Sequence, residues 1–454
     1  MAIRRILIAN RGEIALRVIR TCERLGIETV LAASKADLGS LPALRATRTL
    51  CIGPAPAAQS YLSVPTIVQA ALSSACDAIH PGYGFLSERA ELARLCEAEG
   101  VTFIGPTAGQ IEAVGDKLRA RAEAEAAGVP VVPGGPASSR AEAVELGRRI
   151  GAPLLVKAVG GGGGRGMKRV DDLAGLEEAL ALASAEAAAA FGDDRVYLER
   201  FVARGRHVEL QVLGDGAGTV IHLGERDCSV QRRYQKLIEE TPAPGLPDTL
   251  LNDLREAGVR FARRLDYRGA GTVEFLVDVD RQEFYFLEMN ARIQVEHPVT
   301  EAVSGIDLVE QQIAIAAGEG LGLRQEDVRL AGAAIECRIN AEDPSRDFMP
   351  SPGVVKQAVW PAGDGIRVDT HIGSGSAVPP FYDSLMAKII AHGPTRADAL
   401  ARLRQALDET QIVGVASNIA FQRRVLADPE FAAGGVDTAY LTRLAQREPA
   451  LMEA

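Results

Sequence analysis

Two carboxylates and an amide are predicted to lie on one pair of strands in the middle of the chain. By the two-residue period of a strand, the run 283–290 places on one face the side chains of Phe284, Phe286, Glu288 and Asn290. A short turn makes 272–279 its antiparallel partner, and in that register Glu274 lies opposite Glu288. Facing carboxylates repel each other unless a cation lies between them, and hard oxygen ligands suit Mg²⁺. The pattern predicts a divalent-metal site at Glu274, Glu288 and Asn290; a shifted register that turns one glutamate to solvent is the alternative.

The residues directly after this strand add a cation and another carboxylate. Arg292 continues the parity of Glu288 and is expected to point toward the same site. With Glu296 it offers an anion clamp and a base, whereas a surface ion pair of small energetic value is the alternative. His297 precedes Pro298 and is interpreted as a structural residue.

A glycine-rich loop, 160–166, follows a predicted strand that contains Lys157. Glycine backbone amides can approach phosphate oxygens closely, and Lys157 and Arg165 supply positive charge. A flexible linker is the alternative, and a dinucleotide-binding fingerprint fits loosely, but 167–170 reads as extended where that fingerprint needs a helix. A Walker A loop is excluded because no Gly-Lys-Ser/Thr follows.

Three blocks of predicted elements position these residues, over about 1–113, 114–330 and 331–446. In the first, apolar strands alternate with helices and predict a parallel sheet covered on both faces. The second has short turns between its strands and is expected to be more antiparallel, with a Pro/Gly/Ser-rich linker at 130–139. A helix start with a capping box is expected at Thr107. In the third block a strand-like run is expected at 354–360, before a helix capped at Thr395.

Composition excludes several classes of protein. The chain has 454 residues and a formal net charge of −10, which argues against nucleic-acid binding. Its six cysteines form no CxxC pair and are expected to be buried free thiols. The basic stretch 228–236, with Arg232, Arg233 and Lys236, reads on its own as a solvated loop or a weak nucleic-acid patch. No apolar run has the length of a signal peptide core or a membrane helix, so a cytoplasmic protein with no membrane partner is expected.

Longer motifs resemble the biotin carboxylase component of biotin-dependent carboxylases. They are HPGYGFLSE (80–88), GGGGGRGM (160–167), ERDCSVQRRYQK (225–236), EETPAPG (239–245), GAGTVEFL (269–276), EMNARIQVEHPVTE (288–301) and ECRINAEDP (336–344). The similarity extends from residues 8–17 to beyond 440, and several of these motifs are long and specific.

The resemblance implies an α/β (α+β) fold: a Rossmann-like N-terminal domain, a central ATP-grasp domain with a mobile lid at about 131–203, and a C-terminal biotin carboxylase domain. It implies that ATP phosphorylates bicarbonate to carboxyphosphate, and that the carboxyl group passes to N1 of biotin on a separate carrier protein. This is the first half-reaction of acetyl-CoA carboxylase, which supplies malonyl-CoA for fatty acid biosynthesis, or of a related carboxylase. The implied cofactors are ATP, Mg²⁺ or Mn²⁺, bicarbonate and biotin. The implied partners are a biotin carboxyl carrier protein, carboxyltransferase subunits and a second copy of the chain.

The resemblance also implies a role for each matching residue. ATP is contacted by Lys117, Lys157, Gly163, Gly164, Glu199, Arg200, Phe201, Val202, His207 and Tyr234. The metal is held by Glu274, Glu288 and Asn290. Bicarbonate and biotin are handled by Tyr83, Lys236, Arg292, Gln294, Val295, Glu296 as base, and Arg338.

Three positions depart from the family's pattern. Tyr234 stands where many members have His, Arg200 replaces a common Lys, and Val159 replaces a small polar residue before the glycines. Two other hypotheses stay open on sequence alone: a different ATP-grasp ligase acting on an amine or carboxylate substrate, and a non-catalytic nucleotide-binding protein.

Overall fold

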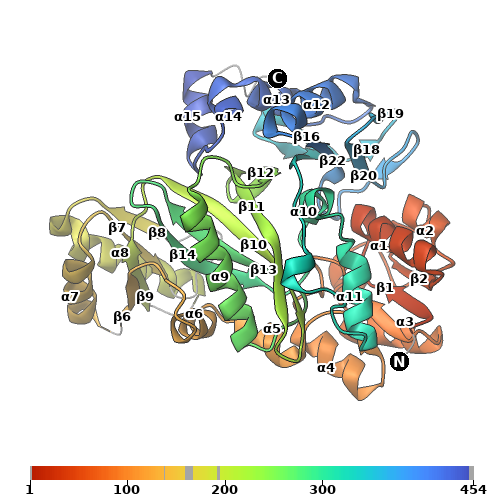
Figure 1. The fold of residues 1–454 in the computed structure, drawn as a ribbon, viewed down its shortest axis with the longest axis horizontal. Coiled ribbons are helices and arrows are strands. Elements are labelled where there is room, and N and C mark those ends of the chain that lie inside the picture. Colours follow the sequence, from red (N-terminus) through yellow and green to blue (C-terminus); the bar gives the residue numbers. More distant parts are fainter. Residues whose placement is uncertain (1–2, 138, 159–166, 192–194, 449–454) are drawn as a thin grey trace.

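The computed structural model describes residues 3–137, 139–158, 167–191 and 195–448, so Val159, Gly163 and Gly164 lie outside the described residues. The N-terminal part is a five-stranded parallel sheet in the order β3-β2-β1-β4-β5, as predicted, with helices packed around it (Figure 1). Its elements are β1 (Arg5–Ile8), α1 (Gly12–Leu25), β2 (Glu28–Ala33), α2 (Leu41–Arg45), β3 (Arg48–Cys51), η1 (Ala57–Gln59), α3 (Val64–Ser73), β4 (Ala78–His80), α4 (Ala90–Ala98), β5 (Thr102–Phe103) and α5 (Ala108–Gly115).

Helix boundaries in this part follow local chemistry. Gly26 ends α1 in the left-handed region at φ 69°, where a residue without a Cβ is favoured. The capping box predicted at Thr107 is present: its side chain accepts from the Gln110 amide at 3.3 Å, and the Gln110 side chain accepts from Thr107 N at 2.9 Å. Thr395 caps its helix in the same way with Asp398.

An eight-stranded antiparallel sheet forms the centre of the molecule, in the order β14-β13-β10-β11-β12-β15-β22-β20. Its strands are β10 (Gly205–Asp215), β11 (Val220–Arg232), β12 (Gln235–Thr241), β13 (Arg268–Asp278), β14 (Glu283–Asn290), β15 (Ala333–Asn340), β20 (Ile366–Thr370) and β22 (Leu385–Gly393). The helices of this region are α6 (Lys117–Ala126), α9 (Asp248–Arg264), α10 (His297–Ser304) and α11 (Leu308–Ala317), with η3 (Gln325–Asp327) after them. The sheet continues past residue 330, because β12 pairs with β15, so residues far apart in the chain share one face.

A four-stranded sheet, β6-β9-β7-β8, stands to one side of the central sheet (left in Figure 1). Its elements are β6 (Gly134–Ala137), α7 (Arg140–Ile150), β7 (Leu154–Ala158), β8 (Met167–Val170), η2 (Leu173–Gly175), α8 (Leu176–Phe191) and β9 (Val196–Arg200). The prediction that 130–139 is a linker is wrong, because 134–137 pairs with β9 as a strand. Backbone pairing with a distant strand overrides the local turn preference of a Gly- and Pro-rich segment.

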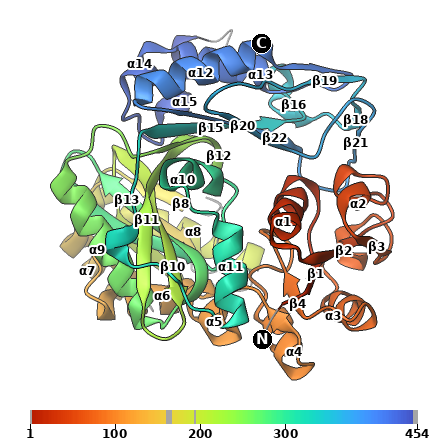
Figure 2. The same cartoon turned by 45° about the vertical axis from the view of Figure 1, so that its right-hand side comes forward.

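The C-terminal part covers one end of the molecule, next to the N-terminal part (Figure 2). Its remaining elements are β16 (Glu342–Asp343), η4 (Pro344–Arg346), β17 (Met349–Pro350), β18 (Gly353–Val354), β19 (Gln357–Val359), β21 (Ala377–Val378), α12 (Arg396–Glu409), β23 (Gln411–Val413), α13 (Ile419–Ala427), α14 (Pro429–Ala433) and α15 (Tyr440–Arg447). The single run expected at 354–360 is two short strands, β18 and β19, which pair with different partners.

Two further features were considered from the sequence, the state of the cysteines and the presence of a membrane helix. All six cysteines are unpaired, but Cys51 is exposed, unlike the other five, because it lies on the edge strand β3 of the N-terminal sheet. None of the helices in the described residues combines the length and the apolar content that a membrane crossing needs.

Candidate active site

A cavity of about 1340 Å³ opens between the N-terminal part, the small sheet and one face of the central sheet. The predicted site residues that the structure describes all line it: Tyr83, Lys117, Lys157, Glu199, Arg200, Phe201, Val202, His207, Tyr234, Lys236, Glu274, Glu288, Asn290, Arg292, Gln294, Val295, Glu296 and Arg338. They come from nearly the whole length of the chain, and the sheet order brings them together.

The predicted strand register is confirmed, but with a bulge. Glu274 lies opposite Glu288, while the next pair is Phe275 with Phe286, so Leu287 is an extra residue on β14. The prediction that Phe284 and Phe286 share the face of Glu288 is therefore wrong: both phenylalanines pack in the core. A β-bulge puts two residues opposite one and resets the two-residue alternation, which is how Glu288 reaches the cavity.

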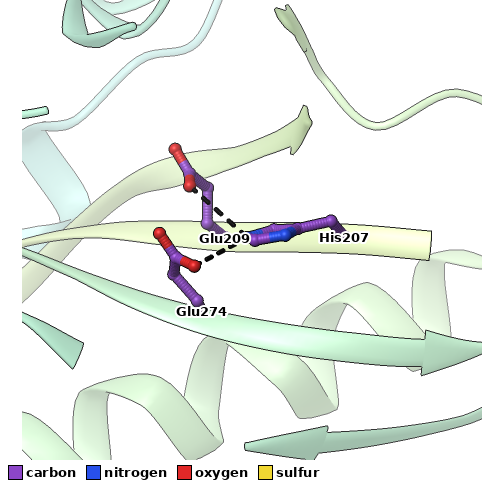
Figure 3. A group of neighbouring side chains, drawn as sticks. All are labelled: His207, Glu209 and Glu274. Carbon is purple, nitrogen blue, oxygen red and sulfur yellow. Dashed lines mark ion pairs between the residues drawn. The ribbon is translucent and has the colours of Figure 1, made fainter. Parts of the chain in front are cut away.

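Glu274 is at the centre of a hydrogen-bonded cluster. Its Oε1 accepts from Asn290 at 2.8 Å, Lys236 at 3.0 Å and Gln294 at 3.1 Å. Its Oε2 lies 2.8 Å from His207 Nε2, and Figure 3 shows the imidazole of His207 directed at both Glu274 and Glu209. Burial opposes ionisation of Glu274, but the charges of Lys236 and His207 outweigh it and hold its pKa below the ordinary value. Glu274 is thus an anion fixed by several donors.

Glu288 is in a different state from Glu274. Its carboxylate has no protein hydrogen-bond partner among the described residues, and it faces a second carboxylate across the ladder. Burial and the charge of Glu274 raise its pKa, while Lys117 opposes this rise. An unpaired carboxylate beside an ionised one, with the amide oxygen of Asn290 nearby, is a donor set that a hard divalent cation fits.

Glu296 is fully buried and is held by two cations, Lys236 at 2.8 Å and Arg338 at 3.1 Å. Burial opposes its charge, but Lys236 and Arg338 hold its pKa well below the ordinary range. Arg292 forms no ion pair with Glu296 among the described residues, so the alternative of a simple surface pair between them does not hold. The turn after β14 directs Arg292 to other acceptors, because β14 ends at Asn290 and the strand parity is lost.

Arg292 is bound by three side chains. It donates from Nε to Glu88 at 2.8 Å, from Nη1 to Gln294 at 2.7 Å and from Nη2 to Asn290 at 2.8 Å. Glu88 was not singled out from sequence, although it ends the motif at 80–88. His297, interpreted as structural, is fully buried, and its Nδ1 lies 2.7 Å from the carbonyl oxygen of Gln294.

The end of the cavity next to the small sheet is lined by basic and aromatic residues. Lys157 on β7 forms an ion pair with Glu199 on β9, its neighbour across the sheet. Arg200 lies 3.3 Å from the hydroxyl of Tyr285, and Phe201 is covered by the guanidinium of Arg169 at 4.2 Å from its ring centre. The side chains of Glu199, Arg200 and Phe201 are therefore each held by a neighbouring residue at this end of the cavity.

The basic stretch 228–236 is not a solvated loop. It is the hairpin of β11 and β12, with Arg233 and Tyr234 at its tip at φ 49° and 67°. Arg232 and Arg233 both pair with Asp347, whereas Lys236 points into the cavity. Tyr234 is 63% exposed at the cavity rim, so it is free to contact a bound molecule there.

On the other side of the cavity, the N-terminal and C-terminal parts meet in a buried ion pair that sequence reasoning missed. Lys388 on β22 pairs with Glu13 of α1 at 3.0 Å and donates to the carbonyl oxygen of Val295 at 2.8 Å. The hydroxyl of Tyr83 donates to the same glutamate, Glu13. Lys388 thus fixes the backbone of Val295 at the cavity wall.

Arg226 on β11 anchors the floor of the site from below. It is fully buried, pairs with Glu209 at 2.5 Å and donates to Gln211 at 2.8 Å and Thr300 at 2.9 Å. We expect Arg226→Ala to lower the free energy of unfolding by about 3–5 kcal/mol. The change removes the cation from Glu209 Oε1 and the donor to Gln211 and Thr300 in a fully buried site, and leaves Lys236 as the one lysine or arginine paired with Glu209 among the described residues. Urea denaturation measures this loss.

The matched control is Arg260→Ala, which removes a 47% exposed guanidinium that lies 3.9 Å from Glu256 on the surface of α9. Its expected cost is about 0–1 kcal/mol. Equal costs for the two variants would contradict the anchoring role of Arg226.

Comparisons with known proteins agree along the whole chain. The family models that match are "Biotin carboxylase, N-terminal domain" over residues 2–111, "Carbamoyl-phosphate synthase L chain, ATP binding domain" over 116–324, and "Biotin carboxylase C-terminal domain" over 336–443. The biotin carboxylase of Allochromatium vinosum is 52% identical over 445 residues, which cover 97% of this chain and 98% of that protein.

Solved structures give the same result. The biotin carboxylase domain dimer of Hydrogenobacter thermophilus 2-oxoglutarate carboxylase, in complex with MgADP, ADP and bicarbonate, has a TM-score of 0.91 and 43% identity, covering 100% of this chain and 99% of that one. The biotin carboxylase of Campylobacter jejuni, in complex with an ATP analogue, has a TM-score of 0.91 and 44% identity, covering 97% and 99%. With the three-part fold and the cavity between its parts, these similarities show that the chain belongs to the biotin carboxylase family.

Proposed function

We propose that this protein catalyses the ATP-dependent carboxylation of biotin on a carrier protein, with bicarbonate as the carboxyl donor. One observation carries the proposal: a single cavity joins a buried glutamate held by two cations, Glu296 with Lys236 and Arg338, to the facing carboxylates Glu274 and Glu288. Glu296 with its two cations can bind an anion and accept its proton. The facing carboxylates can bind a metal ion that contacts phosphates.

At the metal end, Glu274, Glu288 and Asn290 would hold Mg²⁺ or Mn²⁺. The cation, when bound, neutralises charge on the nucleotide phosphates. Lys117, Lys157 and His207 are assigned to the phosphates and ribose, and the segment 199–202 with the rim residue Tyr234 to the base and its surroundings. Phosphoryl transfer depends mainly on such positioning and charge neutralisation, because it requires little covalent chemistry from the protein.

At the other end, Lys236, Arg292, Gln294 and the backbone of Val295 are assigned to bicarbonate. Glu296 is ionised, as a base must be before it accepts the bicarbonate proton. The bicarbonate oxygen attacks the γ-phosphoryl group, ADP leaves, and carboxyphosphate forms. Its carboxyl group then passes to biotin N1 as phosphate departs and takes up the N1 proton, and Arg292 and Arg338 would stabilise the negative charge that develops on biotin.

Tyr83 is assigned to the biotin pocket, because it lines the cavity between the N-terminal and C-terminal parts. The carrier is proposed to be a biotin carboxyl carrier protein, with carboxyltransferase subunits receiving the carboxyl group for malonyl-CoA and fatty acid biosynthesis. A homodimer in the cytoplasm completes the proposal. The domain boundaries near 113 and 330, and the mobility of the lid at 131–203, stay predictions.

Steady-state kinetics test the proposal directly. ATP hydrolysis by the purified protein should require bicarbonate and increase when free biotin is added. Bicarbonate-dependent hydrolysis with no response to biotin would overturn the assignment of the acceptor. Hydrolysis driven by an amine substrate instead would favour another ATP-grasp ligase.

Arg292→Ala should lower the rate of biotin carboxylation by at least about 100-fold, because it removes a preorganised cation from the reacting anions. Nucleotide binding, measured by isothermal titration calorimetry, should be retained, because Arg292 is bound to Glu88 and Gln294, away from the small sheet.

The control for this variant is Arg281→Ala, which removes a 51% exposed arginine from the turn between β13 and β14. It should carboxylate biotin at the wild-type rate. Wild-type carboxylation by Arg292→Ala would contradict the role assigned to Arg292.

A further inference from the structure

Two buried glutamates lie side by side behind the cavity, and no step of the proposed reaction uses them. Glu239 on β12 is directly opposite Glu336 on β15, and neither side chain has any exposed surface. Directly opposite residues of an antiparallel pair have Cβ atoms about 4.5–5.5 Å apart, so the two carboxyl groups can meet. Two facing carboxylates could not both stay charged there, since their repulsion and desolvation add.

The hydrogen bonds of the pair are incomplete in a specific way. Glu239 Oε1 accepts from Arg338 Nε at 2.6 Å, but its Oε2 has no partner among the described residues. Both oxygens of Glu336 are also buried without a partner in the part of the chain that the structure describes. A proton on one carboxyl group would let that group donate a hydrogen bond to the other, because protonation converts an acceptor oxygen into a donor.

The surrounding charges leave Glu336 without a cation of its own. On β22 the nearest cation is Lys388, whose ammonium is directed at Glu13 and the carbonyl oxygen of Val295. On β15 itself, Arg338 is bound to Glu239 and Glu296. At the start of α10, which packs on this face, the N-cap Glu296 adds a negative charge and is itself paired with Lys236 and Arg338. Burial keeps the pKa of the His297 imidazole, on the same helix, well below the ordinary value.

The protonation tendencies agree with this geometry. Burial raises the pKa of Glu336 well above the ordinary value. The positive charge of Lys388 opposes this rise, and the negative charge of Glu239 adds to it. Burial also raises the pKa of Glu239 to about 7, against the pull of Arg338. Groups that interact this closely titrate as a pair, so the proton belongs to both.

We propose that Glu239 and Glu336 share one proton at neutral pH, and that this hydrogen bond between a carboxyl group and a carboxylate holds Arg338 in the orientation in which it meets Glu296. Arg338 then keeps Nε and Nη2 on Glu239 Oε1, while Nη2 also donates to Glu296 at 3.1 Å. Glu239 and Glu336 are positioning residues in this scheme, since they act through Arg338. The proposal has two halves. The positioning half, in which the pair orients Arg338, rests on the proposed carboxylation, whereas the shared proton does not.

Infrared spectroscopy tests the shared proton without any substrate. The difference spectrum between the wild-type protein and Glu336→Gln at neutral pH should contain the C=O stretching band of a protonated carboxyl group, with the shift expected in D₂O. Absence of that band in the wild-type protein would overturn the proposal. The band does not depend on turnover, so it tests the shared proton even if the protein does not carboxylate biotin. If biotin fails to stimulate ATP hydrolysis, the proposed function and the positioning of Arg338 are both overturned, but the shared proton is not.

Kinetics test the positioning half. Glu336→Gln keeps a neutral donor toward Glu239 and should retain kcat/KM for biotin carboxylation within about twofold of wild type. Glu336→Leu removes the donor and should lower kcat/KM by on the order of tenfold or more, the factor that about 1.4 kcal/mol represents. Equal losses in the Gln and Leu variants would overturn the role of the proton.

A matched control separates positioning from general destabilisation. Glu240→Gln alters the next residue of β12, on the opposite face, where the glutamate is paired with Arg396 at 2.6 Å and lies away from the cavity. It should lower the unfolding temperature but leave kcat/KM at the wild-type value. A loss of kcat/KM in Glu240→Gln equal to that in Glu336→Leu would overturn the positioning role.

Discussion

Glu288→Gln should lower the rate of ATP cleavage by at least about 100-fold, the usual scale for loss of one group that stabilises transition-state charge. Gln has nearly the same shape as Glu, so the change removes the charge while β14 and its bulge stay in place. The reason for the large effect is the state of Glu288: its carboxylate has no protein partner among the described residues, so a cation is its natural counter-charge. Measurement of ATP hydrolysis over a range of Mg²⁺ concentrations tests the prediction.

Stability measurements distinguish this effect from damage to the fold. Because Glu288 faces Glu274 across the ladder, neutralising it should leave the unfolding temperature of the metal-free protein unchanged or raise it. The control is Glu256→Gln, which removes a 76% exposed carboxylate from α9 and should hydrolyse ATP normally. Wild-type hydrolysis by Glu288→Gln at low Mg²⁺ would show that this residue does not hold the metal.

The second large effect is expected for Glu296→Gln. Loss of a positioned general base lowers rates by about 10²–10⁴-fold, and we expect the kcat of biotin carboxylation to fall within this range. Glu296 is the only carboxylate among the described residues that contacts both Lys236 and Arg338, the cations assigned to bicarbonate and biotin. The affinity for ADP should not change, because the side chain does not reach the nucleotide end.

Glu301→Gln is the matched control for Glu296→Gln. Glu301 lies on the same region of the chain, in α10, and is also buried between two cations, Arg17 at 2.6 Å and Arg367 at 2.7 Å. Both variants break buried ion pairs and should lose stability by about 3–5 kcal/mol. Only Glu296→Gln should lose carboxylation; a loss of equal size in both would mean that stability, and not proton transfer, explains the effect.

The predicted strands, helices and their caps were mostly confirmed where a local signal exists. The capping box at Thr107 and the helix cap at Thr395 are short patterns that depend only on neighbouring residues, and both are present. The facing pair Glu274 and Glu288 could also be predicted from the sequence, because a short turn sets the register of the strands on either side of it. The bulge at Leu287 could not be found, since an inserted residue leaves the apolar pattern nearly unchanged.

Errors in the sequence analysis occur where a distant partner decides the local structure. The segment 134–137 is a strand because β9 pairs with it, and the hairpin tip at Arg233 is fixed because Asp347 pairs with it. Arg292 binds Glu88, a partner that was not singled out from the sequence, after the turn that follows β14. The partners are distant in sequence: 114 residues separate Arg233 from Asp347 and 204 separate Arg292 from Glu88. At such separations strand parity carries no information.

The sequence by itself determined the family, the residue types that can hold a metal, phosphates and bicarbonate, and the parallel N-terminal sheet. These depend on long motifs and on short-range periodicity. Only the tertiary structure decided which charges are paired: Glu296 with Lys236 and Arg338, Glu13 with Lys388, and Glu239 beside Glu336. The physical reason is that the order of strands in the eight-stranded sheet, which joins β12 to β15 and β15 to β22, sets these neighbours.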